Sequence, residues 1–510
     1  MTGIFVYKNK VGNRYPKKLV KTASKIGHRG QFNKHVVKKD DFFMKVFLNR
    51  PQKKNGKLSF KDEETGKKIH VALDGELVNI REILLELSRP VKENPSTNEI
   101  LYLGYKEWGN DIFKKLNGPY SLLMDVEDKI IAAKDPVGFN PLYVLENDKE
   151  LVISSELKAL NAFSGKPKIL QPGQVFSYAD GNIKYDRFFN IEHLAKKKIE
   201  SSHDVQFYKR KLFNLLKKAV EKSIDANHEV AALLSGGIDS TIICALATIF
   251  ITELDVYTVA YEGSEDLKYA KLFADRHKYD VNHHVYEIKL DDMLSLLPDV
   301  IYHLETFDAA LIRSAIPMYF ISSKVKDGTD ILLTGEGGDE LFGGYSYLSE
   351  MKPKDLKDEI IEMLKIEHAT GLQRVDRIPY GHEIEARAPW FDLDLVKFSF
   401  EIPMGYKIKK VKDDFVEKWI ERETFRHIIP HEIADRKKAK FSKGVGSQFI
   451  LRDHFANLIS DEEFQAEQEV IPNVKVKSKE ELHYWRIFED LFNPNEDFVR
   501  QLPRTAEFIV

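Results

Sequence analysis

Short apolar runs alternate with turn-forming residues along the first part of the chain. The runs include IFVY, FFMKVFL, YSLLMDV, KIIAAKD and LVISSE, with Gly, Asn, Asp or Pro between them. Such runs are typical of β-strands, and closely spaced strands pair antiparallel. Residues 79–88 and 97–107 instead have the apolar spacing of helices. The pattern predicts a β-rich domain over residues 1–195 that ends at a charged connection.

The pattern changes from about residue 205, where continuous apolar strands alternate with helices. The predicted strands are EVAALL, DVYTVAY, NHHVYEI and DILLT, and helices such as IDSTIICALATIF and LKYAKLFADRH separate them. This alternation is typical of a parallel sheet covered by helices on both faces. Beyond about residue 350 the spacing is almost wholly helical. The sequence therefore predicts an α/β domain over residues 205–510 with a helical extension.

Length and composition are those of a globular protein with two domains. The chain has 510 residues, and its 77 basic and 80 acidic residues leave a net charge of −3, which gives no indication of a nucleic-acid partner. The N-terminus lacks the order of a secretory signal and no apolar run could span a bilayer, so we expect a cytoplasmic protein with no membrane partner. The single cysteine, Cys244, excludes an intramolecular disulfide and a Cys-based zinc cluster. The oligomeric state stays open, a homodimer included.

A glycine-rich loop follows the first predicted strand of the second domain, in the segment LLSGGIDST. Ligands of open α/β sheets bind at the carboxyl ends of strands, and adjacent glycines let the backbone approach them closely. The N-terminus of the following helix attracts anions, so the loop suits a phosphate group. The same residues also fit a plain strand-to-helix turn with Asp239 as a cap. The loop residues are Ser235, Gly236, Gly237, Asp239 and Ser240.

An acidic glycine-rich loop, GEGGDELFGG, follows the DILLT strand. Carboxylates that face a triphosphate need Mg²⁺ between them and the phosphate oxygens, and we expect Asp239 and Asp339 to bind this ion. The alternative is a solvated acidic turn. The basic segment DRKKAKFSKGVG offers cations for the β and γ phosphates, although a run of charges is often only a solvated surface.

The glycine-rich loop resembles the SGGxDS loop of the ATP pyrophosphatases and lacks the lysine of a Walker loop, which implies transfer of AMP. With GEGGDELFGG, HEIEARAPWFD, ETFDAALIRSAIPMY and KKAKFSKGVG, the chain resembles the glutamine-hydrolysing, class B asparagine synthetases over nearly its whole length. The resemblance implies an N-terminal αββα sandwich of the Ntn-hydrolase type and a C-terminal parallel-sheet PP-loop domain. It also implies ATP and Mg²⁺ as cofactors.

The resemblance assigns roles to individual positions. The implied ATP and pyrophosphate ligands are Leu233, Leu234, Ser235, Gly236, Gly237, Asp239, Ser240, Val259, Gly335, Glu336 and Lys438. The implied catalytic residues are Glu385, Lys438 and Asp239, with Glu385 as a candidate general base. The implied substrate contacts are Asp308, Arg313 and Asp339.

Several of these roles have a structural alternative. The three apolar residues among the ATP contacts would lie in the core of any such sheet. Glu385 could simply pair with Arg387, and Asp308 and Arg313 could form a structural ion pair.

The reaction that the resemblance implies is amide formation on aspartate. The side-chain carboxylate of aspartate attacks the α phosphorus of Mg–ATP and gives β-aspartyl-AMP and pyrophosphate. Ammonia then displaces AMP to give asparagine. Adenylation is needed because AMP leaves readily, whereas the oxygen of a free carboxylate does not.

The N-terminal domain departs from the family at the site where glutamine would be hydrolysed. Thr2 stands where the family has its cysteine nucleophile, although an N-terminal threonine can itself be a nucleophile. HRGQF keeps Arg29 but loses the following Pro-Asp, and Asp74 in DGELVN puts a repelling carboxylate at the oxyanion hole. The degenerate site comprises Thr2, Arg29, Asp74, Gly75, Glu76 and Thr97, the last in place of an aspartate. We therefore expect a lost glutaminase and ammonia as the nitrogen donor.

Two other functions stay open. Beta-lactam synthetase, carbapenam synthetase and lasso-peptide cyclases resemble the same family and use the adenylate to close a ring, so a cyclase or an amide ligase for another carboxylate is an alternative. A non-catalytic family member is the second alternative. The intact phosphate loop, acidic loop and Glu385 segment favour an enzyme.

Overall fold

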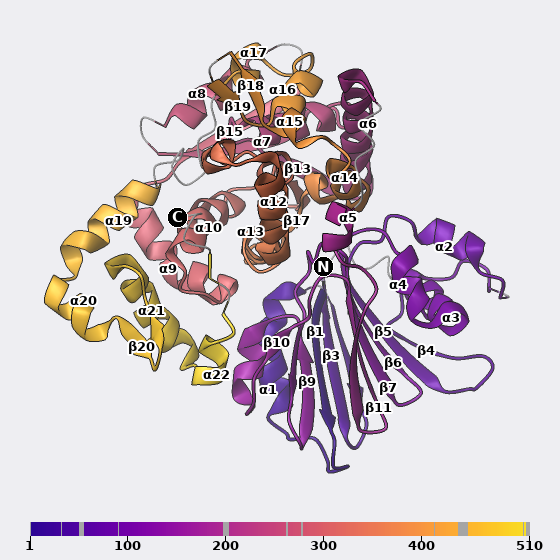
Figure 1. Ribbon diagram of the computed structural model, residues 1–510. Helices are drawn as coiled ribbons and strands as arrows, with labels where there is room; N and C mark the ends of the chain where they lie inside the picture. The colour runs from indigo at the N-terminus through magenta and orange to yellow at the C-terminus, as the bar shows by residue number, and fades with distance from the viewer. Residues whose placement is uncertain are drawn as a thin grey trace. The chain divides into compact units, whose positions relative to one another are not determined.

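The computed structural model divides the chain into two compact units (Figure 1). One unit consists of Met1–Asn190 and Pro494–Leu502, and the other of Ile191–Asn493 and Pro503–Val510. The stretch Pro494–Leu502, which the sequence pattern groups with the second domain, therefore belongs to the N-terminal unit. The structure describes residues 2–31, 33–49, 56–89, 91–196, 203–261, 264–276, 279–412, 414–436, 447–502 and 504–505.

Two antiparallel sheets of six strands each form the described part of the N-terminal unit. The first has the order β10 (Lys168–Ile169), β8 (Tyr143–Glu146), β9 (Glu150–Ser154), β1 (Thr2–Asn9), β3 (Phe42–Leu48) and β2 (Asn33–Lys38). The second has the order β12 (Asn182–Arg187), β11 (Gln174–Ala179), β7 (Lys129–Lys134), β6 (Tyr120–Val126), β5 (Lys68–Gly75) and β4 (Ser59–Lys61).

Alternate residues of the central strands form the core between these two sheets. Ile4 and Val6 of β1 belong to the same buried cluster as Leu123 of β6 and Phe176 of β11. Because successive side chains of a strand point to opposite faces, the residues between them face the outer layers. The apolar alternation of the sequence thus builds a sandwich with one central core.

Short helices cover the outer faces of both sheets. In the second sheet, Leu73 and Leu122 pack with residues of the first long helices in a separate buried cluster. The capping box of Ser96 and Glu99 fixes the start of α3. The unit is therefore a four-layer αββα sandwich, as the resemblance implied. Its helices are α2 (Ile80–Glu86), α3 (Thr97–Trp108), η3 (Gly109–Asp111) and α4 (Ile112–Lys115) by the second sheet, α1 (Leu19–Ala23), η1 (Ser24–Arg29) and η4 (Leu157–Ala162) by the first, and α22 (Glu496–Val499) from the C-terminal stretch.

The sheet of the C-terminal unit is parallel throughout its described strands. Its order is β15 (Val281–Glu287), β14 (Leu254–Ala260), β13 (Glu229–Leu233), β16 (Thr329–Leu333) and β17 (Glu385–Arg387). The chain proceeds from β13 outward to β15 and then returns to place β16 on the other side of β13. Ligands of open parallel sheets bind at such a change of direction, beyond the carboxyl ends of the two central strands. The loops after β13 and β16 start at this point.

Helices connect these strands and continue after them, as predicted. The connecting and preceding helices are α5 (Glu192–Lys196), α6 (Val205–Ser223), α7 (Ile238–Ala247), α8 (Glu265–Ala274), α9 (Leu290–Leu304), α10 (Ala309–Ser322), α11 (Gly338–Phe342), η5 (Ser346–Glu350), α12 (Pro353–Glu367) and α13 (Gly371–Tyr380). The extension contains η6 (Pro389–Phe391), α14 (Leu393–Ser399), α15 (Met404–Lys407), α16 (Trp419–Phe425), α17 (His431–Ala434), α19 (Ser447–Leu458), α20 (Asp461–Glu467) and α21 (Lys479–Phe492). Two hairpins lie within it, β18 (Lys409–Val411) with β19 (Asp414–Val416) and β20 (Glu469–Ile471) with β21 (Val474–Lys475).

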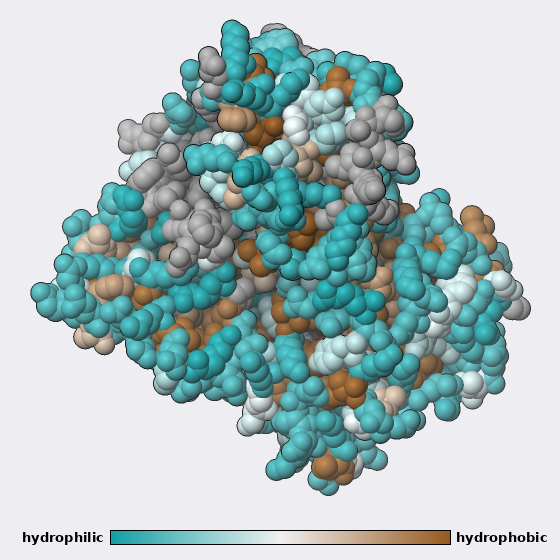
Figure 2. Space-filling model, viewed as in Figure 1, coloured by the Kyte–Doolittle hydropathy of each residue, from teal (hydrophilic) through white to brown (hydrophobic). Residues whose placement is uncertain are grey.

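Few large apolar side chains are exposed among the described residues. The face shown in Figure 2 is mostly hydrophilic, with apolar residues in small scattered patches. Among the described helices, a stretch of the length and apolarity that a bilayer crossing requires does not occur.

A buried lysine packs against the helix that carries the acidic loop. Lys407 is fully buried, and its Nζ lies 5.8 Å from the ring centre of Phe342 in α11 and 5.4 Å from that of Phe400. Its Nζ makes no hydrogen bond to the residues that the structure describes. Burial, with a smaller contribution from the charge of Lys357, lowers the pKa of Lys407 from 10.5 to about 7.

This burial predicts a pH-dependent effect of Lys407→Met on stability. Below about pH 7 both states hold the proton and the fold buries a charge, whereas between about 7 and 10.5 only the unfolded state holds it. The wild-type free energy of unfolding should therefore rise with pH in this range by roughly 1.4 kcal/mol per pH unit from this group, and the rise should be absent from Lys407→Met. Denaturant unfolding at several pH values measures it. Lys397→Met, at an exposed position of α14, is the control, and parallel pH curves for wild type and Lys407→Met would contradict the prediction.

Candidate functional site

The loop after β13 leaves the sheet through a conformation that glycine favours. Leu234 still pairs with the neighbouring strand, since its N–H donates to the Tyr257 carbonyl at 2.9 Å. Gly236 then has φ +75°, and a Cβ there would lie 2.3 Å from the Asp266 carbonyl oxygen. Only glycine fits so close to the start of α8. Gly237 is the N-cap of α7, so the free N–H groups of that helix face the loop.

Two serine hydroxyls close this phosphate loop on itself. Ser235 Oγ and Ser240 Oγ are 2.9 Å apart, and the Ser235 N–H donates to Ser240 Oγ at 3.1 Å. The Gly237 N–H donates to Ser235 Oγ at 3.3 Å. The loop therefore holds hydroxyl and N–H donors together at a helix N-terminus, which is an arrangement suited to anions.

The loop after β16 touches the phosphate loop through two glycines. A Cβ on Gly335 would lie 2.6 Å from the Ser240 nitrogen, and one on Gly338 would lie 2.1 Å from Asp239 Oδ1. Side chains at these positions would force the loops apart. The structure thus brings the two predicted loops together at the switch point of the sheet.

One buried lysine joins the two loops to the helical extension. Lys418 Nζ lies 2.5 and 2.6 Å from the two carboxylate oxygens of Asp239 and 2.6 Å from Asp339 Oδ1. Burial alone would lower the pKa of Lys418, but the carboxylates of Asp239 and Asp339 raise it above its usual range. The lysine therefore stays charged and neutralises part of the negative charge of the pair that we predicted to bind Mg²⁺.

Glu421 is a further buried carboxyl at this cluster, one turn after Lys418. It is fully buried. Burial, and then the neighbouring charge of Asp239, raises the pKa of Glu421 well above its usual range, with Lys418 acting in the opposite sense. Neither Lys418 nor Glu421 stands out in the sequence, because VEKWIERE has the spacing of an ordinary amphipathic helix. The sequence alone offers no signal for a contact between residues 179 positions apart.

The other carboxylates of the acidic loop have partners of their own. Glu336 forms an ion pair with Arg374 of α13. Glu340 accepts a hydrogen bond from the Tyr345 hydroxyl. Burial, together with the charges of Asp339 and Glu336, raises the pKa of Glu340 to about 7.

Glu385 lies on β17, next to the strand that carries the acidic loop. Ile331 of β16 is its register partner. The side chain is buried, and Arg387 Nε donates to Glu385 Oε1 at 2.9 Å. The structural alternative raised for Glu385 is therefore a real contact, and its catalytic role stays a prediction.

The predicted adenosine contacts lie on neighbouring strands. Leu233 ends β13 and pairs in register with Tyr257 of β14, two residues before Val259. The Leu234 carbonyl accepts a hydrogen bond from Thr258 Oγ1 at 2.6 Å. Leu234 and Val259 are buried, as core residues of such a sheet would be.

Asp308 and Arg313 have partners in the C-terminal region. Asp308 caps α10 and accepts hydrogen bonds from the backbone and hydroxyl of Thr505 at 2.8 to 3.0 Å. Arg313 forms a buried bidentate ion pair with Glu480 of α21 at 3.0 Å. The structure does not pair them with each other, and these contacts favour a structural role over the predicted substrate contact.

Lys438 lies outside the described residues. Arg436, two positions before it, is described and reaches the phosphate loop. Its Nη1 donates to the Gly236 carbonyl at 3.3 Å, its Nη2 lies 2.5 Å from Asp266 Oδ1, and its guanidinium stacks 4.2 Å above the Tyr269 ring. The basic segment therefore starts against the phosphate loop.

Buried charges fill the degenerate site of the N-terminal unit. The Thr2 N–H donates to Asp74 Oδ1 at 2.5 Å. Arg29 binds Asp74 at 3.0 Å and Glu156 at 3.1 Å, and Glu156 also pairs with Lys158 at 2.6 Å. These five side chains are almost completely buried. Arg29, which the family resemblance implies would hold the carboxylate of glutamine, is bound by two carboxylates of the chain itself.

Backbone conformation and backbone hydrogen bonds fix the positions of Gly75 and Glu76, two further residues of that site. Gly75 has φ +113°, and a Cβ there would lie 2.2 Å from the Pro119 carbonyl oxygen. The Glu76 N–H donates to the same carbonyl at 2.8 Å. Thr97 is the first residue of α3, in the helical layer. The described hydrogen bonds connect Thr97 to none of the cluster residues Thr2, Arg29 or Asp74.

A parallel sheet with a phosphate loop and an acidic loop at its switch point, preceded by an αββα sandwich, defines a two-domain ligase of a class that uses ATP and carries an amidotransferase-like unit. Comparison with known families agrees. The asparagine synthase family model matches residues 211–365 and 352–504, and a glutamine amidotransferase domain model matches residues 49–162. The chain belongs to the asparagine synthetase family.

Individual relatives are similar over most of the chain. A glutamine-hydrolysing asparagine synthetase from Sandersonia aurantiaca is 31% identical over 447 residues, which cover 84% of this chain and 84% of that protein. Glutamine-hydrolysing asparagine synthetase 2 from Arabidopsis thaliana is 30% identical over 447 residues, which cover 84% of this chain and 76% of that protein. These relatives confirm the family that the motifs indicated.

The close contact of the two loops predicts a large effect of Gly338→Ala. The added methyl group would meet Asp239 Oδ1 at 2.1 Å and displace either the carboxylate or the acidic loop. We expect ATP-dependent pyrophosphate release to fall roughly a hundredfold, as for other small displacements of reacting groups. Gly405→Ala is the matched control, because a Cβ there meets nothing within 4 Å. Equal activity of the two variants would show that the loops do not need this contact.

Proposed function

We propose that the protein converts L-aspartate to L-asparagine by way of β-aspartyl-AMP, with release of pyrophosphate and AMP. The observation that carries this proposal is the junction of the two loops, where Asp239 of the phosphate loop and Asp339 of the acidic loop share the ammonium group of Lys418. This junction offers anion donors and carboxylates at one place. Transfer of AMP from ATP to a carboxylate requires both.

The phosphate loop would bind the β and γ phosphates that leave as pyrophosphate. The N–H groups at the start of α7 and the hydroxyls of Ser235 and Ser240 supply donors to these oxygens. Lys418 stays charged beside them and can stabilise negative charge as the α–β bond breaks. Lys438 would contribute a second cation from the basic segment.

The donor set at the junction fits Mg²⁺. Hard divalent cations of this size bind through one or two carboxylates together with phosphate oxygens, which corresponds to Asp239 and Asp339 with ATP. When bound there, Mg²⁺ would neutralise charge on the phosphates during attack by the carboxylate. Asp239 and Asp339 would hold it, and the Lys418 contacts keep these two side chains oriented.

Glu385 is the residue we propose to accept a proton from the attacking amine. It lies at the edge of the sheet beside β16, on the strand next to the acidic loop. Its pairing with Arg387 keeps the carboxylate charged and oriented. A charged carboxylate can take the proton that ammonia loses when it displaces AMP.

Ammonia is the nitrogen donor that we propose. A glutamine substrate would need the guanidinium of Arg29, which Asp74 and Glu156 already bind. Asp74 would also repel the negative charge that develops on an amide carbonyl under attack. The Thr2 hydroxyl is completely buried and makes no hydrogen bond to the described residues. The Thr2 nitrogen, which would be the base of an N-terminal threonine, is bound to Asp74.

The contacts of Asp308 and Arg313 favour a second candidate function. Both were expected to bind the charged ends of an amino acid, and both are bound by Thr505 and Glu480. Activation of a different carboxylate, followed by ring closure or amide ligation, is therefore the second candidate function.

Aspartate-dependent pyrophosphate release from Mg–ATP is the first measurement. With ammonium present we expect pyrophosphate, AMP and asparagine, identified by mass. Asp239→Asn should lower the rate at least about a hundredfold, because it removes a carboxylate from the loop junction. Glu385→Gln should lower the rate of asparagine formation more than the rate of pyrophosphate release. Asp327→Asn changes the charge equally at an exposed position and is the control. A rate of pyrophosphate release that does not depend on aspartate would favour the second candidate function, activation of a different carboxylate.

Glutamine should fail to replace ammonium in the same assay. We expect no glutamate from glutamine in the wild type, because the buried ion pairs exclude the substrate from Arg29. Thr2→Ala should leave asparagine formation from ammonium unchanged. Glutamate release by the wild type that disappears in Thr2→Ala would overturn the assignment and restore the threonine as a nucleophile.

A further inference from the structure

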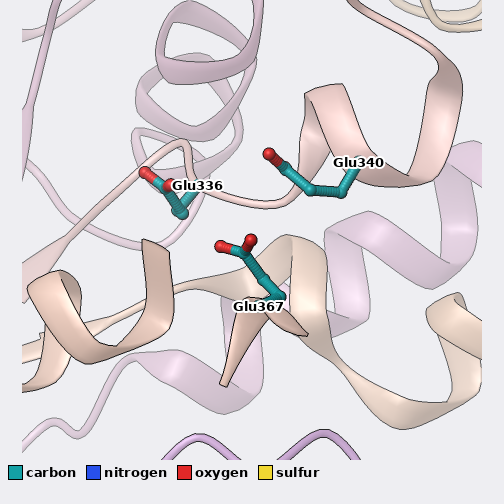
Figure 3. A group of neighbouring side chains, drawn as sticks. All are labelled: Glu336, Glu340 and Glu367. Atoms are coloured by element: carbon teal, nitrogen blue, oxygen red, sulfur yellow. The ribbon is translucent and has the colours of Figure 1, made fainter. Parts of the chain in front are cut away.

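Three glutamates meet beside the acidic loop, next to the Lys418 junction. Glu336 lies in the loop, Glu340 on α11 and Glu367 at the end of α12, and their side chains point toward one another (Figure 3). One carboxylate oxygen from each lies within 4.8 Å of the others. Glu340 follows Asp339 in a helix, where consecutive side chains point in different directions. The trio therefore forms a cluster that borders Asp339 but includes neither Asp239 nor Asp339.

This cluster concentrates negative charge in the interior. Glu340 and Glu367 are 4% and 7% exposed, and the Glu336 side chain is 22% exposed. In the described part of the chain, the one ion pair of these three glutamates is that of Glu336 with Arg374. Three carboxyl groups thus face a single guanidinium. Buried carboxylates need compensation, either from a cation or from protons.

One buried oxygen of the cluster has no hydrogen-bond partner among the described residues. Glu367 Oε2 accepts a hydrogen bond from Thr370 Oγ1 at 3.2 Å, and Glu340 Oε1 accepts one from Tyr345. Glu367 Oε1, by contrast, is buried without a hydrogen bond to any described residue. It belongs to the side chain that faces Glu336 and Glu340 (Figure 3). A buried, unsatisfied acceptor that faces two other carboxylates is in the position of a metal ligand.

A glycine keeps the space beside these oxygens open. A Cβ on Gly371 would lie 1.9 Å from Glu367 Oε1 and 2.7 Å from Glu336 Oε1. Any other residue would fill the space where the two carboxylates approach. The first turn of α13 is therefore shaped around the carboxylates.

We propose that Glu336, Glu340 and Glu367 bind a divalent cation of the Mg²⁺ or Mn²⁺ type, with water completing its coordination. Oxygen donors alone select hard cations, and three carboxylates exceed what a site shared with phosphate uses. The site includes neither Asp239 nor Asp339, and it requires no nucleotide. It assigns Glu336 to a metal in place of the ATP contact that the resemblance implied. The proposal therefore does not rest on the proposed reaction.

Mn²⁺ binding to the full chain without nucleotide tests the site. Protein stripped with a chelator is titrated with Mn²⁺, and free Mn²⁺ is followed by electron paramagnetic resonance. In the background Asp239→Asn with Asp339→Asn we expect one bound Mn²⁺ to remain. Adding Glu367→Gln, which keeps the shape of the side chain, should weaken this binding at least about tenfold. Glu362→Gln, at an exposed position of the same helix, should leave it unchanged.

Unchanged Mn²⁺ binding in the Glu367→Gln protein would overturn the proposal and indicate that protons compensate the cluster. If circular dichroism shows that Glu367→Gln does not fold, Tb³⁺ luminescence tests the site instead, in protein that keeps all three glutamates. The Tyr345 hydroxyl binds Glu340, so its ring can sensitise a lanthanide held by the trio. Tyrosine-excited emission that falls in Tyr345→Phe and is displaced by Mn²⁺ supports the site. Emission that Tyr345→Phe leaves unchanged, or none at all, contradicts it.

Discussion

The shared ammonium group of Lys418 is the interaction on which the synthetase unit depends. It lies between a carboxylate of the phosphate loop and one of the acidic loop, and it enters from the helical extension. Two carboxylates so close together, one buried and one partly buried, would otherwise repel each other and separate the loops. With the charge compensated, glycines let the backbones touch at Gly335 and Gly338. One lysine thus makes a single site from three segments far apart in the sequence.

Buried charges also compensate one another in the N-terminal unit. There, Asp74, Arg29, Glu156 and Lys158 compensate one another in a buried network, with the Thr2 backbone attached to it. Such a network is costly to break, because removing one partner leaves an uncompensated charge. A substrate would have to displace these contacts before it could bind. Both β-sheets and the outer helices lie around the network.

Local patterns of the sequence were enough to predict a β-rich domain, a parallel-sheet domain and the two loops, whereas the αββα sandwich came from the family resemblance. Apolar alternation indicated the antiparallel strands, and SGG after a buried strand indicated the phosphate loop, because both depend on neighbours in the chain. Lys418 and Glu367 escaped prediction since their roles arise from contacts between distant segments, and lysine or glutamate on a helix usually faces water. Asp308 and Arg313 illustrate the reverse case. Their side chains suit a substrate, but the fold supplies Thr505 and Glu480 as partners instead.

The order of the two units along the chain has a consequence for how such proteins can be recombined. Pro494–Leu502 returns to the N-terminal unit after the synthetase unit is complete, and the last residues then return to the synthetase unit. The chain therefore passes between the units three times. An exchange of N-terminal units between family members that moved only the first 190 residues would leave a segment of the old unit behind. An exchange that preserves both units has to move Pro494–Leu502 together with the first 190 residues.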